Sequence, residues 1–290
     1  MASRPVTSLP LSALRDGDRG SLAGMEATVL VLGVVVAFAA AVRSTWSPCG
    51  QSMLSQLTPV GEASRGYRYR TTATWFVLGA VVGGATLGAV MAALAAAVSA
   101  MGATSTALLA IAAGLAGLGA VVDSGVLGVM PPFFKRQVNE YWLSKYRAWV
   151  YGSGFGWQIG AGVTTYIMTA AVFVTVAFGA LTAGPLAALA LGVFFGFVRG
   201  LAVLLTARAR NTTELFALHR RFDALGEPVR RAVIGVQLAV AAVGAGAAWG
   251  LVPGLVVAAV LAVAVLSTLG ARRRGVADAA PDASSHAVTA

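Results

Sequence analysis

The sequence predicts an all-α integral membrane protein of about seven transmembrane helices, each of about 20 apolar residues. Three observations support this class. Of the 290 residues, 58% are hydrophobic and only 11% are charged, the mean hydropathy is +0.79, and several apolar stretches reach the length of a span. A soluble domain of this size has roughly a quarter of its residues charged. The lipid bilayer is therefore the expected environment.

We expect a single polytopic membrane domain over residues 25–270, between an extracytoplasmic tail at 1–24 and a disordered cytoplasmic tail at 271–290. The first apolar run, Ala27 to Val42, is favoured as an uncleaved span over a cleaved signal peptide, although its small residues Ala39-Ala40-Ala41 would suit cleavage. Six further spans are predicted from apolar length, at Thr74–Ser99, Thr104–Met130, Trp157–Leu181, Pro185–Ala207, Ala232–Gly250 and Leu251–Leu269. The segment from Asn211 to Gly226 is predicted as a separate interfacial helix with a capping box at its start.

The positions of the basic residues predict the orientation. With the N-terminus outside, the inner loops and the C-terminal tail receive the basic clusters, which are Arg43 with Arg65, Arg68 and Arg70, then Lys135, Arg136, Lys145 and Arg147, then Arg208, Arg210, Arg220, Arg221, Arg230 and Arg231, and finally Arg272–Arg274. Cytoplasmic loops favour Lys and Arg. Six spans would place Arg272–Arg274 outside. We therefore expect seven spans in the cell membrane, an extracytoplasmic N-terminus and a cytoplasmic C-terminus.

Charge and cysteine content exclude other classes. The chain has 21 Lys and Arg against 11 Asp and Glu, but the basic residues lie between apolar runs rather than on a polar face, so no nucleic-acid partner is expected. One cysteine, Cys49, and two widely separated histidines provide no metal-ligand spacing. Neither a metal nor another cofactor is expected.

A weak internal repeat and recurring glycines predict how the spans are arranged. The segment that begins at Trp46 aligns with the one at Trp157, and the same offset carries Trp75, at span two, to Leu186, at span five. Three spans per half is an odd number, so the halves, about 27–131 and 138–250, would form an inverted 3+3 repeat plus one extra helix. Glycines at helical spacing predict close helix packing within this bundle; they are Gly79, Gly83, Gly84, Gly88, Gly192, Gly196 and Gly200.

The motif Trp46-Ser-Pro-Cys-Gly50 carries the candidate chemistry. Pro48 lacks an N–H group and clashes with the preceding turn, so the first span must kink or stop there. Gly50 permits a close backbone approach, and polar Gln51 would form part of a hydrated wall beside the thiol. Cys49 is therefore the candidate redox thiol. The alternative is a small buried residue without chemistry.

This motif, followed by Leu54 and Pro59, resembles the first half of the cytochrome c biogenesis transmembrane (CcdA/DsbD-like) superfamily. Within it, the chain is nearest to the MauF-type methylamine-utilisation membrane proteins, over about Ala39 to Leu205. The resemblance implies two inverted three-helix halves, each with a proline-adjacent cysteine at a broken helix, that pass reducing equivalents across the membrane. MauF-type proteins are implicated in making a periplasmic amine dehydrogenase, which implies a maturation role.

The second half departs from the superfamily pattern. The family sequence Phe-Gly-Trp-Thr-Pro-Cys corresponds here to Phe155-Gly-Trp-Gln-Ile-Gly160, without the proline and the cysteine. A dithiol relay needs two thiols, so a complete relay within this chain is not expected. The resemblance instead implies a thioredoxin-like or extracytoplasmic redox protein as the partner of Cys49. The residues expected to support the site are Trp46, Pro48, Gly50, Gln51, Trp157, Gln158 and Gly160.

Two charged residues lie inside predicted spans at similar depth. Asp123 is in span three and Arg199 in span five, and an ionisable residue in a span is a functional-site hypothesis. A structural ion pair between them is the favoured interpretation. A substrate or proton site and simple interfacial placement stay open.

Three function classes follow from these features. The Cys49 motif favours redox-linked maturation of an extracytoplasmic partner. The alternatives are a small-solute transporter or exporter, which would use Asp123 and Arg199, and a non-catalytic membrane scaffold. The missing second cysteine favours these alternatives over a complete redox conductor. An enzyme is not the favoured class.

Overall fold

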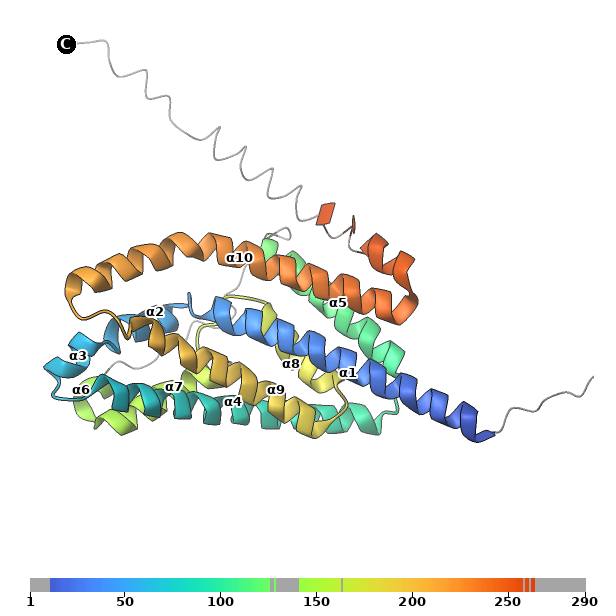
Figure 1. The fold of residues 1–290 in the computed structure, drawn as a ribbon, viewed down its shortest axis with the longest axis horizontal. Helices are drawn as coiled ribbons and strands as arrows, with labels where there is room; N and C mark the ends of the chain where they lie inside the picture. The colour runs from blue at the N-terminus through green and yellow to red at the C-terminus, as the bar shows by residue number, and fades with distance from the viewer. Residues whose placement is uncertain are drawn as a thin grey trace, which may run out of the picture.

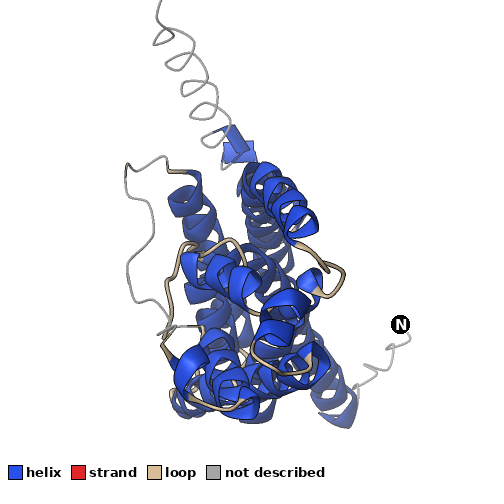
Figure 2. Ribbon diagram, turned by 90° about the vertical axis from the view of Figure 1, so that its left-hand side faces the viewer, coloured by secondary structure: helices blue, strands red, loops and turns tan. Residues whose placement is uncertain are grey.

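The computed structural model describes residues 11–125, 128, 141–162, 164–257, 259–260 and 262–263, and these residues form a helical bundle. Most of the long helices run side by side along one axis (Figure 1), and a view turned by 90° looks along them (Figure 2). In chain order the helices are α1 (Leu11–Ser44), α2 (Pro48–Gln56), α3 (Pro59–Ser64), α4 (Tyr69–Ala100), α5 (Ser105–Ser124), α6 (Trp142–Lys145), α7 (Ala148–Ala161), α8 (Ala171–Leu181), α9 (Pro185–Leu201), the 3-10 helix η1 (Ala202–Thr206) and α10 (Thr212–Trp249).

Among the described residues, five helical segments are long and apolar enough to cross a membrane. They are Gly24–Ser44 in α1, α4, α5, α9 together with η1 (Pro185–Thr206), and α10. The prediction of an all-α, multi-pass membrane protein is therefore confirmed. The count of seven, the inverted repeat and the orientation stay predictions, and part of the predicted last span, Leu251–Leu269, lies outside the described residues.

The predicted fourth span, Trp157–Leu181, is wrong as a continuous helix. The structure divides it between α7 and α8, because Gly162 ends α7 with a φ of 70°. The hydroxyl groups of the following threonines satisfy carbonyls that the ended helix leaves open: Thr164 Oγ1 donates to Gln158 O at 2.9 Å and Thr165 Oγ1 donates to Gly162 O at 3.3 Å. Local side-chain bonds thus stabilise a break that hydropathy does not reveal.

Other predicted boundaries also differ from the structure. The expected interfacial helix and span six form the single helix α10, which contains Pro228 and begins at the predicted cap, where Glu214 N donates to Asn211 Oδ1 at 2.8 Å. Span three ends at Gly125 (φ 74°) rather than Met130. Helix α1 begins at Leu11, inside the segment expected to be a tail.

Helix α4 packs against both α7 and α9 through glycines. A Cβ atom added at Gly84 would lie 2.4 Å from Gly192 O on α9, and one added at Gly83 would lie 2.2 Å from Trp157 O on α7. In the same contact between α4 and α7, a Cβ atom added at Gly156 of α7 would lie 2.0 Å from Phe76 O of α4. These distances leave no room for a side chain, which confirms that the recurring glycines serve close packing within the bundle.

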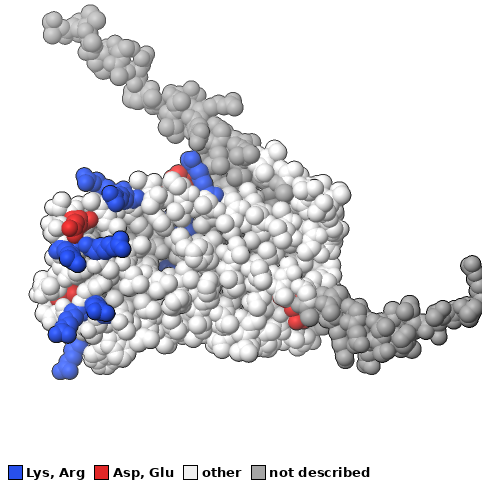
Figure 3. Space-filling model, viewed as in Figure 1, with Lys and Arg blue, Asp and Glu red and all other residues white. Residues whose placement is uncertain are grey.

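The exposed basic side chains that one face presents gather mainly at one end of the bundle. Figure 3 shows them at the left, the end at which α2 and α3 lie in Figure 1. Loops that are far apart in the sequence therefore carry positive charge to a common end, as the positive-inside pattern requires.

Candidate functional site

The Ser-Pro-Cys-Gly motif forms the start of a short helix beside the end of the first span. Helix α1 ends at Ser44, and α2 begins at Pro48 with Ser47 as its N-cap. Gly50 N donates to Ser47 Oγ at 3.2 Å and Gln51 N donates to Ser47 O at 2.9 Å. The predicted helix break is confirmed, and Pro48 occupies the first helical turn, where its missing N–H costs nothing.

Two neighbours of the thiol hold this turn in place. A Cβ at Gly50 would lie 2.1 Å from Thr45 O, so only glycine permits the approach. The ring of Trp46 stacks on Phe222 of α10 with the ring centroids 4.1 Å apart, and Trp46 Nε1 donates to Phe222 O at 2.8 Å. Trp46 therefore ties the turn before α2 to the first half of α10.

The Cys49 thiol is buried rather than hydrated. Cys49 is 2% exposed, and the cavity beside it has a volume of only about 10 Å³. That is at the lower limit of the ~10–15 Å³ that one water needs. The expectation of a hydrated thiol wall is wrong for this conformation, and Gln51 is exposed elsewhere on α2.

Helix α7 closes the other side of this cavity with two residues of the segment Phe155–Gly160 that were not among the predicted site residues. Phe155 and Ile159 line it together with Ser52, Met53, Gln56 and Leu57 of the α2 region. Phe155 and Ile159 are four residues apart, so a helical projection of α7 could have placed them on one face.

The predicted α7 residues have other roles. Trp157 Nε1 donates to Thr86 Oγ1 at 3.1 Å, and Gln158 contributes its carbonyl to the bond from Thr164. A Cβ at Gly160 would lie 2.0 Å from Ala80 O of α4. None of the three is among the residues that line the Cys49 cavity.

Asp123 is a buried hydrogen-bond acceptor that joins three elements. It is 7% exposed and lies at the end of α5. Its carboxylate accepts from Thr169 Oγ1, from Ala170 N at the start of α8, and from Gln237 Nε2 of α10, each at 2.7 Å. Both carboxylate oxygens are therefore engaged by neutral donors.

Arg199 lies elsewhere, on the α7 side of the bundle. It is 3% exposed, its guanidinium carbon lies 5.6 Å from the centre of the Phe195 ring, and a Cβ at Gly162 would lie 3.5 Å from its Nη1. Nη1 has no hydrogen-bond partner among the described residues.

The expected ion pair between Asp123 and Arg199 is therefore wrong. The described part of the chain shows no contact between them, because Thr169, Ala170 and Gln237 occupy the Asp123 carboxylate and Arg199 lies beside Phe195. Nor do the described residues contain a group of three or more His, Cys, Asp or Glu side chains that could hold a metal.

Comparison with known proteins identifies relatives of the chain. No family model matches it, and no solved structure is similar to it. Methylamine utilization protein MauF from Paracoccus versutus is 32% identical over 181 residues, and the MauF protein from Methylophilus methylotrophus is 33% identical over 185 residues. These matches cover 60% and 63% of this chain, and 64% and 65% of the relatives, which is less than two thirds of each relative's length.

The MauF protein of Paracoccus denitrificans is matched over a larger share of its length. It is 30% identical over 189 residues, which make up 64% of this chain and 67% of that protein. Shared identity at this level over two thirds of a relative, together with the apolar helices, identifies the family: the chain belongs to the MauF family of methylamine utilization membrane proteins.

Proposed function

We propose that this protein acts in the redox-linked maturation of an extracytoplasmic partner, and that Cys49 is the reacting group. The observation that supports this most directly is the setting of the thiol. Cys49 follows Pro48 in the first turn of α2, at the break after the first span. The nucleophile in exchange with a disulfide is a cysteine thiolate.

The reaction that one thiol supports is exchange with a disulfide of another protein. The Cys49 thiolate attacks one sulfur of the partner disulfide, a mixed disulfide forms, and the other partner sulfur leaves as a thiolate. Attack by that leaving thiolate, or by another thiolate of the same partner, releases Cys49 and gives no net oxidation or reduction. Attack by the dithiol of a thioredoxin-like protein instead releases Cys49 and reduces the partner overall.

Membrane placement is part of this proposal. We propose the cell membrane, with the N-terminus extracytoplasmic and the C-terminus cytoplasmic, on the basis of the basic loops. The relatives are named for methylamine utilization, and we propose that the partner belongs to the same process.

Trapping of the mixed disulfide tests the role of Cys49. Cells that express the full chain are quenched with acid, free thiols are alkylated, and adducts of this protein are separated without reductant. We expect an adduct that reductant removes and that Cys49→Ser abolishes while the membrane level of the protein is unchanged. A matched control places a thiol on the exposed face of α2, as Cys49→Ser with Gln51→Cys.

The control distinguishes a specific site from a merely accessible sulfur. We expect the Gln51→Cys protein to react readily with a maleimide but to form little of the partner adduct. Equal adduct from both positions, or full function of Cys49→Ser in growth on methylamine, would contradict the redox proposal. The transporter or scaffold hypothesis would then replace it.

A further inference from the structure

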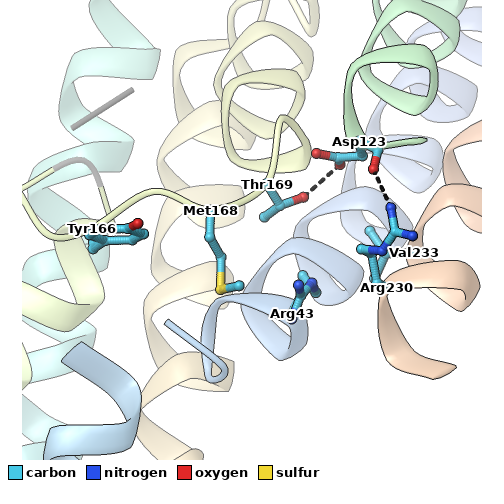
Figure 4. Close-up of a pocket in the computed structure, with 7 residues that line it drawn as sticks. All are labelled: Arg43, Asp123, Tyr166, Met168, Thr169, Arg230 and Val233. Carbon is cyan, nitrogen blue, oxygen red and sulfur yellow. Dashed lines mark hydrogen bonds between the residues drawn. The ribbon is translucent and has the colours of Figure 1, made fainter. Parts of the chain in front are cut away.

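A second cavity lies away from Cys49, where the end of α1, the end of α5, the segment before α8 and the middle of α10 meet. Its volume is about 120 Å³, well above the ~10–15 Å³ needed for one water. Figure 4 shows the residues that line it, with Arg43 between Met168 and Arg230. The side chains that matter for its chemistry are Arg43, Arg230, Asp123 and Thr169.

Arg43 is a buried cation at this cavity. The residue is 8% exposed, and within the described part of the chain its guanidinium has no hydrogen bond and no ion pair. A buried charge is costly unless it is paired and hydrogen-bonded. The guanidinium offers five N–H donors in a planar fork, so the cavity contains donors that lack an acceptor.

The side-chain oxygens of Asp123 and Thr169 at the cavity are engaged elsewhere. The Asp123 carboxylate bonds to Thr169, Ala170 and Gln237. Thr169 donates its hydroxyl proton to Asp123 and accepts from Ala171 N at 3.2 Å. The carboxylate thus neutralises part of the local charge from a distance, but it does not satisfy the donors of Arg43.

Arg230 is the second cation at the cavity, and its bonds hold it in place. It pairs with Glu227 at 2.7 Å and donates from Nη1 to the backbone oxygen of Asp123 at 2.9 Å. Glu227 is shared with Arg231, whose Nε lies 2.9 Å from it. The carboxylate of Glu227 is therefore committed to α10 and leaves Arg43 unpaired.

We infer that this cavity binds an oxyanion, a carboxylate or phosphate group, through Arg43 with Arg230 beside it. Guanidinium groups bind these oxyanions by two parallel hydrogen bonds, which a chloride ion cannot accept in the same way. The site lies at the ends of α1 and α5, so the oxyanion can come from a soluble anion or from a lipid headgroup. This inference is independent of the role of Cys49.

Direct binding to the purified full chain tests the site. The protein is delipidated in a non-ionic detergent and dialysed to equilibrium against radiolabelled inorganic phosphate at fixed ionic strength, with acetate as competitor. We expect about one saturable phosphate per chain, and at least a tenfold loss of affinity in Arg43→Gln. Arg231→Gln is the matched control, because its side chain is 47% exposed and does not line the cavity.

A second arm distinguishes the source of the anion. Phosphatidylglycerol is added to the delipidated protein, and retained lipid is counted by native mass spectrometry. Retention of one lipid by wild type and Arg231→Gln but not by Arg43→Gln, without binding of free phosphate, would assign the site to a headgroup. Arg43→Lys keeps the charge and should retain part of the binding, which separates loss of the ligand from loss of the fold. Failure of wild type to bind either probe, or equal binding by Arg43→Gln, overturns the inference.

Discussion

Replacement of Asp123 by alanine should destabilise the bundle through its hydrogen bonds rather than through a lost ion pair. Three donors, two of them at the start of α8 and one on α10, lose their acceptor. Interhelical hydrogen bonds in membranes contribute about 0.6 kcal/mol each on average, and bonds to charged groups in soluble proteins about 1.5–3 kcal/mol. Gln237 Oε1 already has no hydrogen-bond partner among the described residues, so within this part of the chain its amide would be left wholly unsatisfied. We expect a loss of about 3 kcal/mol in the free energy of unfolding.

Asp123→Asn is the matched control. It keeps one acceptor oxygen, and its new amide group faces Gln237, whose Oε1 can accept from it once the glutamine amide turns over. We expect a loss below about 1 kcal/mol. Unfolding is followed by circular dichroism as sodium dodecyl sulfate is titrated into mixed micelles.

The double exchange Asp123→Arg with Arg199→Asp supplies the refuting result. An ion pair would be kept in the exchanged protein. The hydrogen bonds observed at position 123 would be lost, because Thr169 Oγ1, Ala170 N and Gln237 Nε2 all donate toward it and an arginine there cannot accept. We expect no recovery relative to the single variants. Recovery of stability in the exchange, or wild-type stability of Asp123→Ala, would show the reasoning to be incorrect.

Three further predictions concern packing, anchoring and topology. Gly84→Val should prevent folding, because its Cβ would meet the backbone of α9 at 2.4 Å, whereas Gly114→Ala, which meets nothing within 4 Å, should leave the yield of folded protein unchanged in size-exclusion chromatography. Trp46→Phe keeps a ring stack but loses a 2.8 Å hydrogen bond, and should lower the free energy of unfolding by about 1 kcal/mol in the same titration; a loss above about 3 kcal/mol would mean that more than the bond is lost. A reporter fused after Arg274 should be cytoplasmic and one before Arg4 extracytoplasmic; a periplasm-active reporter at the C-terminus would contradict the seven-span prediction.

Apolar length and charge were enough to predict the class of fold, but not every helix boundary. The segment between α7 and α8 contains Ile167 and Met168, so hydropathy continues across it, and only Gly162 with its positive φ and the neighbouring threonine bonds end the helix. Gly226 misled in the opposite direction. It was predicted to end a separate interfacial helix, yet α10 continues through Gly226 and Pro228, and α10 packs against α5.

The candidate site was predictable in its position but not in its surroundings. Pro48 and Gly50 located the break, since their backbone requirements act locally. The neighbours of Arg199 depend on how far α9 is rotated about its axis, which the depth of a residue in a span does not determine. Asp123 likewise needed Gln237, a residue more than a hundred positions away that no local pattern connects to it.

The glycine contacts of α4 have a consequence for motion. Because α4 touches α7 and α9 backbone to backbone, these three helices cannot slide or rotate against one another without a steric clash, and they behave as a single rigid plate. Phe155 and Ile159, which cover Cys49, belong to that plate. Helix α2, which carries Cys49, stands outside the plate, so access to the sulfur requires a movement of α2 rather than of the wall opposite it.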